Sequence, residues 1–273
     1  MNEILRKFER RAEAVGSLLC VGLDPDIDRI PARFQELELP LFAFNQWIIE
    51  QTHACAAAYK PNMAFYEARG IQGLRELEQT IEYLRGEHPD IVTVCDAKRG
   101  DIGNTNRGYA VSIFDAMGFD AVTLHPYLGR EALAPFLERR DKACIVLCRT
   151  SNPGAGEFQD LESGGRPLWE TVARRVSEEW DAAGNCMLVV GATYPEEMRR
   201  IRAIAPTIPF LVPGVGAQGG DVPAVVAAGL DAQGKGLLIS SSRGILFSDD
   251  PAGAARTLRD EINAAREAVH AAS

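Results

Sequence analysis

The residues best suited to chemistry form one short run, Asp96-Ala97-Lys98-Arg99-Gly100-Asp101, in which two aspartates flank a lysine at spacings of two and three. In an extended segment, Asp96 and Lys98 point to the same side of the chain. Carboxylates close to an ammonium keep it protonated and fix its direction. The run would therefore present an oriented cation to a bound molecule. The simpler interpretation is a solvated charged turn. The secondary-structure elements around the run are needed to choose between this turn and a functional site.

A second candidate is the glycine-rich run from 213 to 221, Pro-Gly-Val-Gly-Ala-Gln-Gly-Gly-Asp. Glycines let main-chain amides approach an anion, and a following helix N-terminus favours negative charge. The run contains GxGxxG, but a dinucleotide-binding motif should open a βαβ unit and be followed by an acid about 20 residues later. Here one further strand follows, and it ends in Ser240-Ser241-Ser242-Arg243, with no acid at that position. A phosphate loop is the better interpretation, with Arg243 placed to pair with the phosphate.

Both runs follow short apolar segments. These segments lack polar alternation, which is typical of strands buried on both faces of a parallel sheet. The predicted strands are Leu18–Leu23, Ala56–Lys60, Ile91–Cys95, Ala121–Leu124, Ala143–Cys148, Cys186–Val190, Pro209–Val212 and Gly236–Ser240. Amphipathic segments between them predict helices over Gly73–Arg85, Asn106–Met117, Leu168–Ala183 and Pro195–Ile204, with Asn104 or Thr105 as the cap of the second.

Successive strands begin about 31 residues apart, which suits βαβ units of about 30 residues or more. Eight such units predict an α/β fold, a (β/α)8 TIM barrel with an extra N-terminal helix and a closing helix after Asp250-Pro251. No stretch resembles a linker, so we expect residues 1–273 to form a single catalytic domain. A doubly wound open sheet is the alternative. In a barrel, catalytic residues follow the strands and phosphate binds after strands seven and eight. The longest irregular stretch, 151–167, is then expected to be functional.

Composition narrows the partners. A net charge of −9 argues against nucleic acid or an anionic membrane surface, although an anionic metabolite can still bind a small cationic pocket. No apolar run approaches the roughly 18 residues that cross a bilayer, and the N-terminus is not typical of a signal peptide. The six cysteines show no CxxC pair or zinc-like spacing. We therefore expect a cytoplasmic protein with no metal, and we interpret His125, which ends the fourth strand, as structural.

Residues 96 to 105, Asp-Ala-Lys-Arg-Gly-Asp-Ile-Gly-Asn-Thr, resemble the signature of the orotidine 5′-phosphate decarboxylase family, in its longer-chain bacterial branch. Further residues at predicted strand ends resemble the family's substrate-binding set. Each has a plainer interpretation by itself, as a turn residue or an exposed lysine. The resemblance extends from residue 24 to residue 243, and its matching residues are Asp24, Lys60, Ser151, Pro213, Gln218 and Arg243.

The resemblance implies cofactor-independent decarboxylation of orotidine 5′-monophosphate to UMP and CO2, the final step of de novo pyrimidine nucleotide biosynthesis. It implies that Lys98 stabilises and protonates the C6 carbanion while Asp96 orients that lysine. It also implies a homodimer in which Asp101, Ile102 and Thr105 reach the partner's active site. The remaining roles it implies are ribose contact by Asp24 and Lys60, reading of the pyrimidine edge by Ser151, packing of Pro213 against the base, and phosphate binding by Gln218 and Arg243.

Two other functions remain open. Relatives that share the Asp-x-Lys-x-x-Asp pattern use it with magnesium on sugar phosphates; Lys60, Ser151 and the loop around Gln218 favour a nucleotide instead. A non-catalytic protein that binds a phosphorylated metabolite would keep the barrel, but it would have no need for a lysine held between acids.

Overall fold

Eight parallel strands close into a barrel in this computed structural model, which describes residues 1–215 and 220–272, except for the side chain of residue 272. The order around the barrel is β1-β10-β9-β8-β5-β4-β3-β2, and β1 pairs with both β10 and β2. The (β/α)8 prediction is confirmed, and the open doubly wound sheet is wrong. The barrel strands are β1 Leu19–Gly22, β2 Ala58–Lys60, β3 Val92–Arg99, β4 Ala121–Leu124, β5 Ala143–Arg149, β8 Cys186–Val190, β9 Phe210–Pro213 and β10 Leu237–Ser241.

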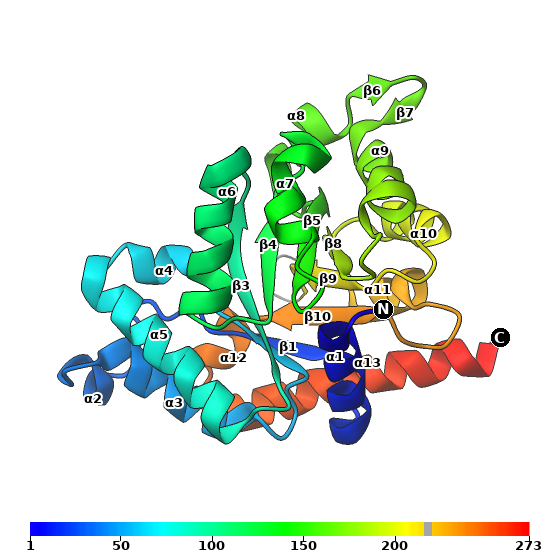
Figure 1. Ribbon diagram of the computed structural model, residues 1–273. Helices are drawn as coiled ribbons and strands as arrows, with labels where there is room; N and C mark the ends of the chain where they lie inside the picture. The colour runs from blue at the N-terminus through cyan, green and yellow to red at the C-terminus, as the bar shows by residue number, and fades with distance from the viewer. Residues whose placement is uncertain (216–219, 273) are drawn as a thin grey trace.

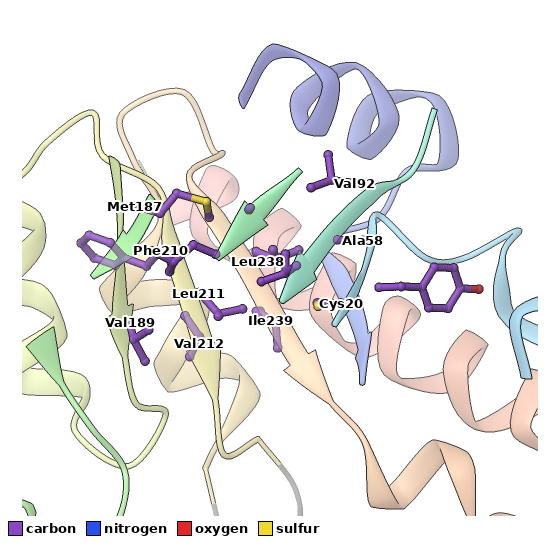
Figure 2. Packing of buried hydrophobic residues seen from close by; sticks show 14 of the residues in the cluster. Cys20, Ala58, Val92, Met187, Val189, Phe210, Leu211, Val212, Leu238 and Ile239 are labelled. Atoms are coloured by element: carbon purple, nitrogen blue, oxygen red, sulfur yellow. The ribbon is translucent and has the colours of Figure 1, made fainter. Parts of the chain in front are cut away.

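The strands are continuous apolar runs because their side chains are buried in the packed core of the barrel. Strand residues such as Leu211, Leu238 and Ile239 are at most 2% exposed, and their side chains pack beside one another from β9 and β10 (Figure 2). Seven predicted strands match the observed ones to within about two residues at each end. The exception is β3, which was expected to end at Cys95 and continues to Arg99. The first four residues of the charged run, Asp96 to Arg99, are therefore part of the barrel wall.

Helices surround the strands. The predicted amphipathic segments are helical, and two of them end in a π-helical turn, Val111–Ala116 and Val176–Trp180. Several of the remaining helices were not expected from the sequence pattern. The helices are α1 Glu3–Val15, α2 Ala32–Gln35, α3 Pro40–Thr52, α4 Met63–Glu67, α5 Gly70–Glu87, α6 Gly103–Ala110, α7 Gly129–Leu137, α8 Gly156–Gln159, α9 Leu168–Arg175, α10 Pro195–Ile204, α11 Val222–Gly229, α12 Arg243–Leu246 and α13 Pro251–Ala272.

The extra N-terminal helix α1 covers the end of the barrel where the strands begin. Asn2 caps it and also holds the carbonyls of Arg140 and Lys142, just before β5, while Lys7 pairs with Asp120, just before β4. The Phe8 side chain of this helix is buried. One end of the barrel is thus closed, which leaves the other end for a site.

At that other end, the stretch 151–167 is more regular than expected. It holds a 3-10 turn at Pro153–Ala155, then α8, then a hairpin of β6 (Glu162–Ser163) and β7 (Arg166–Pro167). These elements stand away from α1 (Figure 1). The Arg149 side chain, 3% exposed at the end of β5, pairs with Asp160 just after α8 and lies 3.8 Å from Glu197 of α10. The segment is therefore attached to the barrel by a buried cation.

The cap predicted for α6 is wrong. Ile102, not Asn104 or Thr105, occupies the N-cap position and gives no side-chain hydrogen bond. Asn106 ties the turn instead, because its side chain bonds both the N–H and the carbonyl of Asp101. The turn is thereby fixed from inside the helix.

Candidate active site

Three charged side chains from β2 and β3 converge at the open end of the barrel. The Lys60 Nζ donates to Asp96 Oδ2 at 3.0 Å, and the Lys98 Nζ donates to Asp96 Oδ1 at 2.7 Å. The Lys60 and Asp96 side chains are 7% and 11% exposed, whereas that of Lys98 is 50% exposed. One carboxylate therefore holds two ammonium groups, of which Lys98 is by far the more exposed. We call these three residues the charge array.

The buried pair of the array, Lys60 and Asp96, is held in its ionised form by neighbouring charges. Burial by itself would lower the pKa of Lys60, but Asp24 and Asp96 outweigh it, so its pKa lies above the usual range. Burial would raise the pKa of Asp96, and here the two lysines outweigh it, so its pKa lies well below the usual range. Lys60 and Asp96 are therefore both charged near neutral pH.

The backbone at Lys98 is unusual. Its φ is +47°, the only positive φ of a non-glycine residue in the described ranges 1–215 and 220–272. The pairing of β3 with β4 shifts register between Cys95 and Arg99. Thr123 of β4 lies within this irregularity: its Oγ1 accepts from the Lys98 N–H at 2.9 Å and donates to Asp96 Oδ1 at 3.0 Å.

A pocket of about 420 Å³ adjoins the array. Strand ends supply most of its wall, and the stretch after β5 supplies the rest. Of the residues predicted for the site, it brings together Lys60, Asp96, Lys98, Ser151 and Pro213. The residues that the sequence analysis missed are Thr123, Leu147, Thr150, Asn152, Gln159, Val189 and Leu211.

Gln159 of α8 helps to shape this pocket. Its side chain accepts from the Thr150 N–H at 3.0 Å and donates to Thr150 Oγ1 at 2.7 Å. Ser151 is set against Gly191, where an added Cβ would lie 2.8 Å from the serine backbone nitrogen. The position of Ser151 thus depends on close contact between the ends of β5 and β8.

Of three further predicted residues, Asp24, Arg243 and Gln218, the first two are not among the described residues that line the pocket. Asp24 follows β1, and its Oδ1 accepts from the Asn62 N–H at 3.0 Å, beside Lys60. Arg243 is exposed at the start of α12, and β10 before it pairs with β1. Gln218 lies outside the described residues.

Asp101, Ile102 and Thr105 do not line the pocket. The Asp101 Oδ1 accepts from the Ile102 N–H at 2.7 Å, within its own turn, and the Ile102 side chain is 60% exposed. Thr105 is also exposed. These three residues form an outward face beside the charge array.

His125, which directly follows β4, contacts this turn, because its Nε2 lies 2.8 Å from the Gly100 carbonyl oxygen. An added Cβ at Gly100 would meet the imidazole ring at 2.5 Å. Residue 100 must therefore be small, and the histidine packs on the turn without lining the pocket. In the described part of the chain, no three His, Cys, Asp or Glu residues gather in a way that could hold a metal ion, and all six cysteines are free and buried.

Comparison with known proteins agrees with this geometry. Residues 17–258 match the family model described as "Orotidine 5'-phosphate decarboxylase / HUMPS family". The chain belongs to that family. It is 49% identical over 271 residues to the orotidine 5′-phosphate decarboxylase of Cellvibrio japonicus, covering 96% of this chain and 98% of that protein. It is 52% identical over 245 residues to that of Halorubrum lacusprofundi, covering 88% and 86%.

Solved structures of the same family agree in fold. Leishmania donovani OMP decarboxylase aligns with a TM-score of 0.88 and 43% identity, covering 98% of this chain and all of that one. Leishmania donovani UMP synthase aligns with a TM-score of 0.89 and 45% identity, covering 97% of this chain but 57% of that longer one. In the described part of this chain, no helix is both long and apolar enough to span a membrane. Family membership and the barrel are thus established together.

Proposed function

We propose that this chain decarboxylates orotidine 5′-monophosphate to UMP and CO2, the final step of de novo pyrimidine nucleotide biosynthesis. The observation that carries the proposal is the charge array: Lys98, held 2.7 Å from Asp96, opens on a pocket of about 420 Å³. The names of the similar decarboxylases support the same substrate.

The chemical task is to break the bond between C6 and the carboxylate so that the electron pair stays on C6 while CO2 leaves. The pyrimidine ring delocalises this pair poorly. In the proposed mechanism, the Lys98 ammonium stabilises the developing negative charge and then transfers one proton to C6. The neutral amine regains a proton from solvent. A fixed cation in a water-poor pocket stabilises such charge far more than it would in water.

Asp96 has two tasks in this proposal. It orients Lys98, and it places negative charge near the departing carboxylate. Lys60 keeps Asp96 ionised, as the direction of the Asp96 pKa indicates, and contacts the ribose together with Asp24. No step uses a cofactor or a metal.

Binding energy from the rest of the nucleotide supports catalysis at C6. Ser151 would read the pyrimidine edge and Pro213 would pack on the base, and both line the pocket. Arg243 and Gln218 would bind the phosphate. Because the phosphate is remote from C6, its binding energy helps to close and order the site, so a substrate without phosphate should lose turnover as well as affinity.

The proposal includes a cytoplasmic homodimer whose protomer, residues 1–273, is one catalytic domain. Asp101, Ile102 and Thr105 would enter the partner's active site. Their support is the outward face described above, on which Ile102 is 60% exposed.

The direct test is loss of orotate absorbance when the purified protein is mixed with orotidine 5′-monophosphate. No change at saturating substrate would refute the proposal. The assay is repeated with a chelator present: unchanged turnover is expected, and magnesium-dependent turnover would favour the sugar-phosphate relatives.

The variant Lys98→Ala tests the role of the lysine. Turnover should fall by at least about 10²- to 10³-fold, because the variant lacks the cation beside C6. UMP affinity should stay within about threefold, since UMP carries no charge at C6 for Lys98 to stabilise. Lys235→Ala, at the closed end of the barrel where Lys235 pairs with Glu13, is the matched control and should keep full activity. Substantial turnover by Lys98→Ala would exclude Lys98 as the proton donor.

A further inference from the structure

The left-handed backbone conformation of Lys98 requires a physical explanation. A lysine at φ +47° lies in the left-handed region, where a side chain with a Cβ costs roughly 1–2 kcal/mol. Such strain persists only where the surroundings fix the conformation. Here it follows the register shift that starts at Cys95, so the regular β3–β4 ladder does not hold the Lys98 backbone.

Thr123 supplies the hydrogen bond that fixes the Lys98 backbone. It lies on β4, its side chain is buried with 1% of the residue exposed, and its Oγ1 accepts from the Lys98 N–H at 2.9 Å. A threonine hydroxyl carries one proton and two acceptor lone pairs. Because the Lys98 N–H occupies an acceptor position, the hydroxyl proton remains available for a second partner.

That second partner is Asp96. The Thr123 hydroxyl lies 3.0 Å from Asp96 Oδ1, the same oxygen that accepts from the Lys98 Nζ at 2.7 Å. The hydrogen bonds form a closed ring, from the Lys98 N–H through the hydroxyl to the carboxylate oxygen and back to the same lysine's ammonium. One hydroxyl therefore fixes both ends of the lysine, its backbone and its charged tip.

We propose that Thr123 is a positioning residue, which holds Lys98 in its left-handed conformation and aims its ammonium along Asp96 into the pocket. This inference rests on the decarboxylation proposed above. It adds that the position requires a hydroxyl, so that serine can replace threonine whereas valine, which has nearly the same shape, cannot.

Three variants test this idea. Thr123→Val removes both hydrogen bonds with little change in volume, and kcat should fall by roughly 10²-fold, the cost of misplacing a reacting group by about 1 Å. The KM for orotidine 5′-monophosphate and the affinity for UMP should stay within about threefold, because the lost interaction acts in the transition state. Thr123→Ser keeps the hydroxyl and should restore kcat to within about threefold of the parent.

The control is Thr93→Val. Thr93 is also a buried strand threonine, 1% exposed, but its Oγ1 accepts from the Asp120 N–H, on the loop that leads into β4. This variant should lose stability comparably and keep the parent kcat. A kcat for Thr123→Val within threefold of the parent would overturn the inference. So would an equal loss of kcat in Thr123→Ser or in Thr93→Val, since either result indicates a packing role.

A measurement without turnover separates this inference from the proposed function. Amide hydrogen exchange at Lys98, followed by NMR in the unmodified protein, should be slow because the N–H is bonded to Thr123. Exchange in Thr123→Val should be faster at this amide. Fast exchange at Lys98 in the parent refutes the inference even if the valine variant does not fold. Slow exchange in a protein without decarboxylase activity would instead refute the proposed function and leave the hydrogen bond standing.

Discussion

Replacing Lys60 by methionine should destabilise the protein strongly at neutral pH. The Lys60 Nζ lies 3.0 Å from Asp96 Oδ2, and both side chains are about nine-tenths buried. At an effective dielectric constant of about 20, a pair at this distance gains roughly 5 kcal/mol of attraction. Desolvation offsets much of this gain in the intact protein, but Lys60→Met leaves the Asp96 charge buried. Removing one partner of such a pair costs about 3–5 kcal/mol.

The lower end of that range applies here, because Asp96 keeps its bonds from Lys98 and Thr123. For a chain of this size, about 3 kcal/mol corresponds to a fall in Tm of roughly 6–12 °C. Urea unfolding at pH 7 measures the free energy directly. The double variant Lys60→Met/Asp96→Asn should recover part of the loss, because it leaves no buried charge without a close partner.

The pH dependence gives a sharper test. The pKa of Asp96 is lowered in the folded parent, so its stabilisation is complete above the unfolded value of about 3.9 and is lost as pH falls through the folded value. The pKa of Lys60 is raised, so its contribution is complete below the unfolded value of about 10.4 and is lost as pH rises through the folded one. The gap between parent and Lys60→Met should be widest from about pH 5 to pH 10 and should narrow below about pH 4, where Asp96 of the variant can take a proton. A deficit under about 1 kcal/mol, or one that does not vary with pH, would refute this account.

Two further substitutions test the supports of the site. Gly191→Ala should lower kcat/KM by about 10- to 100-fold, because the new Cβ would lie 2.8 Å from the Ser151 nitrogen and displace this pocket residue. Steady-state kinetics measures this, and Gly86→Ala, where an added Cβ meets nothing within 4 Å, should behave as the parent; equal kinetics for both variants would contradict the prediction. Tyr66→Phe should cost about 1–3 kcal/mol in urea unfolding, because the fully buried hydroxyl donates to the Leu23 carbonyl at 2.8 Å; a loss below about 0.5 kcal/mol would show that the carbonyl finds another donor.

The barrel could be predicted because its signal is simple. Strands buried on both faces must be apolar throughout, and a parallel connection needs a length close to the spacing observed in this sequence. The strand ends then selected Lys60, Asp96 and Ser151, which the structure brings to one pocket. These residues could be predicted because each was expected at the end of a strand, which is where catalytic residues lie in a barrel of this kind.

The rest was out of reach for identifiable reasons. Charged residues indicate a turn, so the extension of β3 to Arg99 was missed. Thr123 is missed because threonine is an ordinary strand residue, and only the register shift reveals that its hydroxyl is used twice. The cap of α6 was misassigned because the side chain of Asn106, inside the helix, accepts a hydrogen bond from the Asp101 N–H in the preceding turn. Capping rules consider the residue at the N-cap and not such a contact from the helix interior.

The charge array departs from two general rules of folding, and the departure at Lys98 has no parallel at another non-glycine residue of the described chain. Lys98 holds a left-handed backbone without being glycine, and Lys60 places an ammonium in the barrel wall. Local rules of folding are expected to fail at functional sites, where stability is given up for a fixed geometry. A protein that only bound a phosphorylated metabolite would gain nothing from straining Lys98. The strain is useful only if the position of the Lys98 ammonium matters to a reaction, and for this reason the departures favour catalysis over binding alone.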